Sequence, residues 1–474
     1  MERDISRLKD LLVMKFGGTS VGSAERMKAS CDLIAQEASG RSVVAVVSAM
    51  SKITDLLLEI TRHAEGGDQS GVSRGLEQLE SRHRAAAREL VPPEDLVRVL
   101  ASLDEIAADF RRIVNGMLML AYRPPRAVDE AIAVGERLSA LLISEHLLSR
   151  GIAAEAVNAS GAIVTDAVFN NASPLMAATQ EKASARILPL LEAGIIPIVT
   201  GFNGATADGR RTTLGRGGSD FSASILAAAL GASELWIWTD VDGIMTADPR
   251  LVPDARILDE ITYSEAAELA YAGAKVLHPR TLAPLVQRGI PVWSKNSFAP
   301  EKPGTRIVPK LGAGNSGARA VTSMANVALV SLEPANAAVG GVHIMARSLD
   351  ALDRANVEIL AISSSSYRQS FCFLVRKDEL EKATEAIEAA LALELAHGYV
   401  KGIEADTDVG LLAVVGEGMR GFSGLAGRIF TAISREHVNI IAIAQGSSEL
   451  TISIVVRRDG LEKAVRAVHA ECHM

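Results

Sequence analysis

The stretch TTLGRGGSDFSASILAAAL, residues 212–230, joins a glycine-rich turn to an apolar helix. Arg216, Ser219 and Asp220 lie in this turn, where backbone N–H groups at a helix N-terminus point outward at the positive end of the helix dipole. Such a turn is typical of an anion site, and the planar guanidinium of Arg216 can hold a carboxylate with two hydrogen bonds. The alternative, a charged residue of a surface loop, does not account for the pattern GRGGSD.

Strands and helices alternate around this turn from residue 11 to about 295. This alternation predicts an α/β fold with an open, mostly parallel sheet and helices on both faces, in which ligands bind beyond the carboxyl ends of the strands. Residues 72–121 are expected to form a helical excursion, broken at Pro92 and Pro93, to which no chemistry is assigned. The expected strands include RSVVAVVSAM (41–50), GIIPIVTGF (194–202), ELWIWTDVDGI (234–244) and GIPVWSKN (289–296).

The chain changes character after residue 297. Residues 298–324 are rich in Pro, Gly and polar side chains, which predicts a linker that also supplies one strand, ARAVTSM (318–324). Two copies of a β-α-β-β-α order follow, over 325–405 and 406–474, and indicate tandem ferredoxin-like α+β repeats. The second copy ends before its closing strand, so the strand at 318–324 is expected to complete it. Residues 1–297 are the predicted catalytic domain.

The composition excludes several classes of function. The net charge of -8 and the aromatic content of 4% argue against nucleic acid as a partner. Cys31, Cys372 and Cys472 are too few and too scattered for a disulfide framework or a zinc site, and we expect buried thiols. The N-terminal residues lack the apolar core of a signal peptide, and no apolar run approaches the ~20 residues of a membrane span. A soluble cytoplasmic protein without a membrane partner is expected.

Lys15 in LLVMKFGGTS (11–20) precedes its glycines, so the stretch is not a P-loop. By itself it could be only a charge beside a tight turn, but WTDVDGIMTADPR (238–250) and AGAKVLHPRTL (272–282) add polar residues at further strand ends. Turn formation is the alternative for the first of these, and His278 in the second is more typical of a structural role. The sequence contains no motif of a protease or a zinc site. Its lysines, arginine and glycine-rich turns at strand ends are typical of phosphoryl transfer. A carboxylate acceptor needs no general base, and lysines with Mg²⁺ would offset the repulsion between anions.

GEGMRG (416–421) matches the dinucleotide fingerprint G-x-G-x-x-G. The next expected strand turns back at once instead of crossing over, and the repeat is too small for half of a dinucleotide-binding fold. A nicotinamide site there is therefore not favoured.

Six motifs in order resemble the aspartate kinases (aspartokinases) of the amino-acid kinase superfamily. They are KFGGTS (15–20), SAMSKITD (48–55), GERLSALL (135–142), TTLGRGGSD (212–220), TDVDGIMTADPR (239–250) and GAKVLHP (273–279), followed by two repeats similar to ACT domains. The regulatory half is most similar to the kinase portion of bifunctional aspartokinase–homoserine dehydrogenases, notably in QGSSELTISIVV (445–456). The chain ends where a dehydrogenase would begin, so a single activity is expected.

The resemblance implies a three-layer amino-acid-kinase domain that transfers the γ-phosphate of ATP to the β-carboxylate of L-aspartate, giving 4-phospho-L-aspartate. Lys15 would neutralise the transferring group, Lys275 would act with it, and Asp220 would organise both lysines without acting as a base. Mg²⁺ would be held by ATP oxygens and not by protein ligands. The implied aspartate site consists of Thr54, Glu136 (on the ammonium group), Phe202, Arg216 and Ser219. The implied ATP site consists of Lys15, Phe16, Gly17, Gly18, Ser48, Thr239, Asp240, Met245, Arg250 and Lys275.

Two positions depart from the family pattern. Met245 stands where an aromatic residue is frequent, and His343 lies near a position where a glycine is expected in the first ACT repeat. Feedback by lysine, threonine or methionine at the ACT repeats and a homodimer or homotetramer are expected, although His343 argues against assuming ordinary lysine or threonine inhibition. The competing hypotheses are a non-catalytic amino-acid sensor with a vestigial kinase domain, and a kinase of another acidic amino acid such as glutamate or acetylglutamate.

Overall fold

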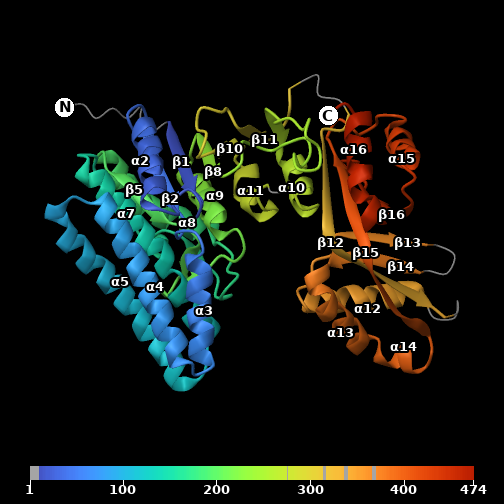
Figure 1. The fold of residues 1–474 in the computed structure, drawn as a ribbon, viewed down its shortest axis with the longest axis horizontal. Helices are drawn as coiled ribbons and strands as arrows, with labels where there is room; N and C mark the ends of the chain where they lie inside the picture. The colour runs from blue at the N-terminus through green and yellow to red at the C-terminus, as the bar shows by residue number, and fades with distance from the viewer. Residues whose placement is uncertain (1–9, 275, 313–316, 336–339, 366–369) are drawn as a thin grey trace. The chain divides into compact units, whose positions relative to one another are not determined.

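The computed structural model describes residues 10–274, 276–312, 317–335, 340–365 and 370–474, and Figure 1 shows the ribbon. The described chain forms two compact units. The first contains the chain up to Ile244, Asp259–Tyr263 and Leu277–Pro309, and the second contains Met245–Leu258, Ser264–Val276 and Lys310–Met474. Lys275, one of the predicted catalytic residues, lies outside the described residues.

The first unit is built on an eight-stranded sheet with the order β3-β5-β2-β1-β8-β10-β11-β9. Every pair of neighbours is parallel except β10 and β11, which confirms the predicted mostly parallel sheet. All six residues of β1 are buried, because helices cover both faces of the sheet. The strands are β1 (Leu11–Phe16), β2 (Ser42–Val47), β3 (Ala154–Val157), β5 (Ile196–Thr200), β8 (Glu234–Thr239), β9 (Glu260–Thr262), β10 (Val292–Asn296) and β11 (Thr305–Val308).

Helices complete three layers in this unit. α2 (Ala24–Ala38) and α7 (Val134–Ser149) pack together against one face, and α8 (Met176–Glu192) and α9 (Gly218–Leu230) pack together against the other. α11 (Pro279–Val286) contacts α9, and a small second sheet joins β4 (Val164–Thr165), β6 (Asn203–Thr206) and β7 (Arg211–Thr213).

The predicted helical excursion consists of α4 (Gln69–Leu90) and α5 (Pro93–Leu120), separated where Pro92 and Pro93 interrupt the chain. Both run beside α3 (Ile53–Glu65), as Figure 1 shows, and α6 (Pro125–Ile132) follows them. Their outer faces are charged, but Leu79 and Phe110 are fully buried in the main apolar core. The excursion therefore extends the core of the unit.

The second unit has a six-stranded sheet with the order β13-β14-β12-β15-β17-β16. Its strands are β12 (Ala320–Pro334), β13 (Ala361–Ser364), β14 (Phe371–Arg376), β15 (Val400–Val415), β16 (Ile440–Gln445) and β17 (Thr451–Arg457). Its helices are α10 (Tyr263–Tyr271), which begins at the unit boundary, α12 (Gly341–Arg354), α13 (Leu380–Ala390), α14 (Ala392–Ala396), α15 (Leu425–Arg435) and α16 (Leu461–Glu471). Short 3₁₀ turns lie at Ala159–Gly161 in the first unit and at Lys377–Glu379 and Arg458–Gly460 in the second.

Both repeats of the second unit share two long strands. Ala320–Met324 of β12 pairs with Leu411–Val415 of β15, and Val330–Leu332 of β12 pairs with Ile403–Ala405 of the same partner. The register shifts between these two halves. The sequence pattern shows two separate strands on either side of residue 325, whereas the structure makes them one continuous strand with an irregularity in its middle.

The strand predicted at 318–324 is confirmed as the start of β12, which pairs with Leu411–Val415 of the second repeat. The rest of segment 298–324 and the segment 245–258 differ from the sequence prediction. The former, a predicted linker, contains β11, which pairs with β10 and β9 in the main sheet. The latter, placed by sequence in the catalytic domain, belongs to the second unit because Ala247 and Val252 are buried in the apolar core of the second repeat. Neither segment has the length or periodicity by which tertiary burial could be predicted. Within the described ranges, no helix is long and apolar enough to cross a membrane.

Candidate active site

Lys15 and Asp220 form an ion pair at the carboxyl end of the central strand. Lys15 is the fifth residue of β1 and is 7% exposed, and its Nζ lies 2.5 Å from Oδ1 of Asp220. Asp220 lies in the first turn of α9, so the contact joins the first motif of the chain to GRGGSD. A Cβ added at Gly17 would lie 3.4 Å from the lysine Nζ, so the glycine keeps the ammonium group accessible from the backbone side.

The turns after four strands are joined beside this ion pair. The backbone N–H of Gly17 donates to the carbonyl of Trp238 at 3.3 Å, and that of Ser48 donates to the carbonyl of Phe16 at 3.1 Å. Gly201 donates likewise to Val47 at 2.8 Å. The carboxyl ends of β1, β2, β5 and β8 therefore meet, and Phe16, Gly17, Gly18 and Ser48 lie at this common edge.

Glu136 is a buried carboxylate with one unused oxygen. It lies in the first turn of α7, is 2% exposed, and accepts a hydrogen bond on Oε1 from the backbone N–H of Ala49 at 3.1 Å. Among the described residues, Oε2 has no hydrogen-bond partner although it is buried. Burial raises the pKa of Glu136 to about 7, and the Ala49 N–H opposes this rise. A buried acceptor left open in this way is suited to an ammonium group from a ligand.

Arg216 is the cation of the glycine-rich turn. Its side chain is exposed, and it makes no ion pair with any other described residue. Left-handed backbone at Gly215 (φ 74°) and Gly217 (φ 68°) makes the turn in which it lies. The turn thus presents, four residues before Asp220, a guanidinium that forms no ion pair within the described part of the chain.

Phe202 and Ser219 lie on neighbouring elements, and Thr54 lies on α3. Phe202 has a left-handed backbone (φ 70°), and its ring packs on Gly218, where an added Cβ would come within 2.6 Å of the ring. Ser219 lies close to Gly201, because a Cβ added at Gly201 would lie 2.8 Å from the Cβ of Ser219. Thr54 is the second residue of α3 and is partly exposed.

The predicted nucleotide residues divide between the two units. Thr239 ends β8, where its Oγ1 accepts from the N–H of Val241 at 3.1 Å, and Asp240 is exposed. Met245 and Arg250 belong to the second unit, in which Arg250 pairs with Asp248. The structure therefore brings together the predicted residues on β1, α7, α9 and β8. Met245 and Arg250 belong to the second unit and are not part of this group.

Asp242 makes two contacts that the sequence does not reveal. Its carboxylate accepts from Nζ of Lys302 at 2.6 Å and from the amide of Asn296 at 2.6 Å, and these contacts hold its pKa below the usual value. His278 caps α11 by accepting the N–H of Arg280 at 3.2 Å, which confirms the structural role expected for it. No group of three His, Cys, Asp or Glu residues in the described ranges could hold a metal ion.

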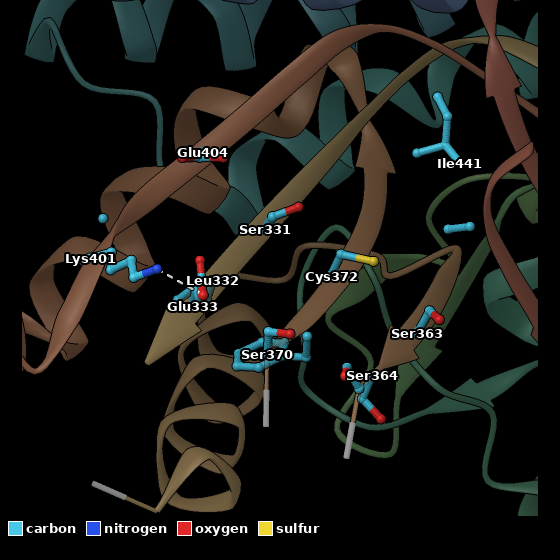
Figure 2. Close-up of a pocket in the computed structure, with 14 residues that line it drawn as sticks. Ser331, Leu332, Glu333, Ser363, Ser364, Ser370, Cys372, Lys401, Glu404 and Ile441 are labelled. Atoms are coloured by element: carbon cyan, nitrogen blue, oxygen red, sulfur yellow. Dashed lines mark ion pairs between the residues drawn. The ribbon is translucent and has the colours of Figure 1, made fainter. Parts of the chain in front are cut away.

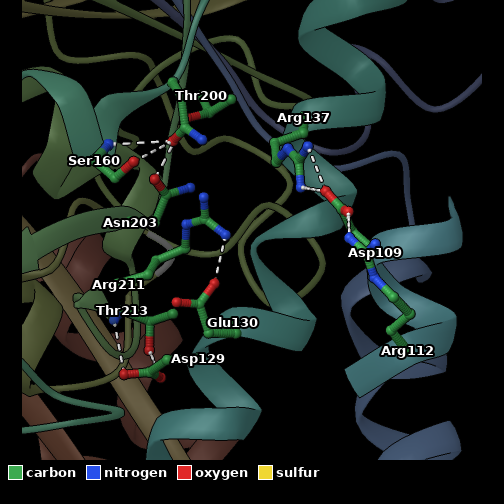
Figure 3. A network of polar contacts seen from close by, with 11 residues as sticks. Asp109, Arg112, Asp129, Glu130, Arg137, Ser160, Thr200, Asn203, Arg211 and Thr213 are labelled. Carbon is green, nitrogen blue, oxygen red and sulfur yellow. Dashed lines mark hydrogen bonds and ion pairs between the residues drawn. The ribbon is translucent and has the colours of Figure 1, made fainter. Parts of the chain in front are cut away.

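A network around Asp129 and Arg211 was missed by sequence reasoning (Figure 3). Asp129 accepts from the hydroxyl of Thr213 at 2.6 Å, and Glu130 accepts from Arg211 at 2.7 Å. Arg137 and Asp109 form a separate contact at 3.0 Å. The available signal is the pair of acidic residues, Asp129 and Glu130, in the otherwise apolar stretch of residues 127–134.

The second unit contains a polar cavity of about 500 Å³ on the sheet of the first repeat (Figure 2). Lys401 and Glu333 form an ion pair across its wall at 2.8 Å, and Glu404 lies on the same strand as the lysine. Hydroxyl groups line much of the remainder, from Ser331, Ser363, Ser364, Ser365 and Ser370. Charges of both signs beside hydroxyl groups suit a small zwitterion.

The comparisons agree with this geometry. The profile of the amino acid kinase family matches residues 10–296, and that of the ACT domain matches 337–391 and 412–472. Lysine-sensitive aspartokinase 3 of Escherichia coli is 32% identical over 98% of this chain and 99% of its own. Bifunctional aspartokinase/homoserine dehydrogenase 1 of Arabidopsis thaliana is 34% identical over 98% of this chain, which spans 51% of that relative. The chain thus covers about half the length of several relatives that it matches.

Solved structures show the same fold. E. coli aspartokinase III in complex with aspartate and ADP has a TM-score of 0.82 at 31% identity, covering 98% of this chain and all of that one. Its complex with lysine and aspartate has a TM-score of 0.81. Aspartate kinase of Clostridium acetobutylicum follows at 0.79 and 26% identity, with 97% of this chain and 100% of that chain covered. By profile, by sequence over its whole length and by fold, the chain belongs to the amino acid kinase family, among the aspartokinases with ACT domains.

Proposed function

We propose that this protein is an aspartate kinase that transfers the γ-phosphate of ATP to the β-carboxylate of L-aspartate. The observation that carries the proposal is the ion pair of the buried Lys15 with the half-buried Asp220, which follows the turn that presents Arg216. The similar E. coli enzyme binds aspartate and ADP, which supports the same pair of ligands here.

Each side chain has a distinct part in the proposed reaction. Arg216 and Ser219 hold the substrate carboxylate, Glu136 accepts the ammonium group on its free Oε2, and Phe202 and Thr54 complete the pocket. Lys15 neutralises charge on the phosphoryl group during transfer, while Asp220 holds the lysine in place. The acceptor carboxylate is ionised at neutral pH, so catalysis consists of positioning and electrostatic stabilisation.

Mg²⁺ is proposed to enter with ATP, held by phosphate oxygens, where it would neutralise phosphate charge. The described residues contain no cluster of acidic and histidine side chains that could bind it independently. No step in the proposed reaction depends on a protein ligand to the metal. Phe16, Gly17, Gly18, Ser48, Thr239, Asp240, Met245, Arg250 and Lys275 are the proposed ATP contacts.

The proposal includes a division of the chain. Residues 1–297 would carry the catalytic residues, although 245–258 belongs to the second unit. Residues 298–324 would connect, with β11 in the main sheet and one strand supplied to the second repeat. Residues 325–405 and 406–474 would be two regulatory ACT domains in a homodimer or homotetramer. The cavity at Lys401 and Glu404 is a candidate place for a feedback amino acid, for which lysine, threonine and methionine are the candidates. Lysine is bound in one structure of the E. coli relative, which supports testing it first.

The test is a hydroxylamine-trapping assay for acyl phosphate with ATP, Mg²⁺ and aspartate, glutamate or N-acetylglutamate. We expect a signal with aspartate only. Arg216→Ala should raise the KM for aspartate about 100-fold, because a charged bidentate contact is lost. Arg210→Ala is the matched control, since Arg210 is a partly exposed arginine six residues before Arg216 and pairs with Asp208. A signal with glutamate alone, or no turnover with any acceptor, would refute the proposal.

A further inference from the structure

Two adjacent acidic residues of α6 reach the same short strand, β7, but at different ends. Glu130 pairs with Arg211 at the start of the strand at 2.7 Å. Asp129 bonds instead to Thr213, its last residue, after which the chain enters the turn that carries Arg216. Figure 3 shows both contacts side by side. Of these two acidic residues, Asp129 is therefore the one that contacts the strand end where the turn begins.

Asp129 is fully buried and accepts three hydrogen bonds. The N–H of Thr213 donates at 3.0 Å and its hydroxyl at 2.6 Å, and the N–H of Asn170 donates at 2.9 Å. No lysine or arginine forms an ion pair with this carboxylate among the described residues. Burial raises the pKa of Asp129, and the hydrogen bonds oppose the rise. A carboxylate whose described partners are all neutral donors is costly to bury, so its place beside Thr213 calls for a reason beyond packing.

Arg280 holds the other side of the same turn. From α11 it donates to the carbonyl of Leu214 at 3.2 Å and to that of Ala172 at 2.6 Å, and it also donates to the side chain of Asn171. The N–H of Ala172 in turn donates to the carbonyl of Thr213 at 2.9 Å. The loop at residues 170–173 is thus fixed at one end by Asp129 and at the other by Arg280, with the strand end between them.

The turn is tightly packed at its first residues. A Cβ at Gly215 would lie 2.6 Å from Oδ1 of Asn171, the same atom that accepts from Arg280. Arg216 is the next residue, and its side chain makes no ion pair with another described residue that would orient it. Its direction depends on the backbone that Asp129 and Arg280 hold.

We infer that Asp129 and Arg280 are positioning residues for the glycine-rich turn, which they hold at Thr213 and Leu214 so that Arg216 and Ser219 meet the substrate carboxylate. This inference rests on the proposed function. Neither side chain needs to touch substrate, because each acts through the backbone at the start of the turn. Misplacement of a binding group by about 1 Å can cost about 100-fold in rate.

The test compares Asp129→Asn with Glu130→Gln, two isosteric changes on adjacent residues of one helix. The asparagine keeps one oxygen for the two backbone N–H donors, but it has no negative charge and its amide can only donate to the Thr213 hydroxyl. The charge-assisted hydrogen bonds are lost, so the turn should loosen. We expect kcat/KM for aspartate to fall about 10- to 100-fold while the KM for ATP changes less than about twofold. Glu130→Gln should leave both parameters unchanged, and Arg280→Ala should reproduce the effect of Asp129→Asn.

Hydrogen exchange gives a readout that does not need turnover. Amides of residues 214–220 should exchange about tenfold faster in Asp129→Asn than in the wild type or in Glu130→Gln. If wild-type protein lacks activity on aspartate, the proposed function fails, while the exchange result still decides whether the turn is held by Asp129. Wild-type exchange over 214–220 in a folded Asp129→Asn protein would overturn the inference.

Thr213 provides a second route should Asp129→Asn fail to fold. Thr213→Ser keeps both donors to Asp129, whereas Thr213→Val keeps only the backbone N–H. The inference requires wild-type kinetics and exchange for the serine variant, and a loss in kcat/KM together with faster exchange for the valine variant. Identical behaviour of the two variants would overturn it.

Discussion

Under the proposed function, Glu136 should make the binding of aspartate depend on pH in a range where aspartate itself does not titrate. Its Oε2 is buried and without a hydrogen-bond partner among the described residues, and burial raises its pKa to about 7. An ammonium group needs the ionised form, so protonation of Glu136 competes with substrate. With a pKa of about 7, the KM for aspartate at pH 6 should be about tenfold higher than at pH 8.

The substitution Glu136→Gln removes the charge but keeps the shape of the side chain. The KM for aspartate should rise about 100-fold at pH 8, because the amide cannot form the ion pair, and its dependence on pH between 6 and 8 should disappear. Initial rates by hydroxylamine trapping at pH 6, 7 and 8 measure both effects.

The same change should stabilise the protein without ligand. The folded pKa of Glu136 is raised, so the folded state binds more protons than the unfolded state between pH 4.5 and 7, and stability falls as pH rises through that range. Above pH 7 the ionised carboxylate costs about 3 kcal/mol, part of which Glu136→Gln should recover. Urea unfolding at pH 8 tests this. A variant that binds aspartate worse yet unfolds later separates a functional role from a folding defect.

Glu145 provides the control for this experiment. It lies on the same helix and is nearly as buried, but Arg98 satisfies it at 2.7 Å. Glu145→Gln should lower stability and leave the KM for aspartate and its pH dependence unchanged. A wild-type KM that stays constant within twofold from pH 6 to 8 would refute the reasoning, as would an unchanged slope in Glu136→Gln.

Three further predictions follow from individual contacts. Lys15→Ala should lower kcat about 1000-fold with little change in the KM for aspartate, measured by the same trapping assay, and near-normal turnover would contradict the role of this lysine. Burial lowers the pKa of His83 to about 4, so the folded state binds fewer protons than the unfolded state between pH 4 and 6.5, and stability falls as pH drops through this range. Between pH 6.5 and 5, the free energy of unfolding in urea should therefore fall by about 2 kcal/mol more for the wild type than for His83→Gln. The same pH dependence in both proteins would contradict this prediction. Gly215→Ala should destabilise the protein by about 2 kcal/mol more than Gly209→Ala, because both glycines have a left-handed backbone but only Gly215 is crowded. Thermal unfolding measures both variants, and equal losses of stability would show that the turn is not tightly held.

The local pattern of the sequence determined the elements of this protein. Short β-branched runs and glycine-rich turns predict β1, β2, β5 and β8 and the polar residues after them, because side-chain periodicity and turn preference act over a few residues. The parallel order then places Lys15 and the GRGGSD turn at one end of the sheet. The motif resemblance adds Glu136, which by local pattern alone is only an acidic residue in the first turn of a helix.

Only the tertiary structure decided which groups are left without partners and which are shared between elements. Three features depend on chain segments distant in sequence: the Glu136 oxygen that has no partner among the residues described, the contacts of Asp129 and Arg280, and the inclusion of Ala247 and Val252 in the second unit. The continuous strand β12 likewise depends on the pairing of both its halves with β15. Burial and hydrogen-bond satisfaction are properties of the packed chain, and a local sequence pattern does not contain them.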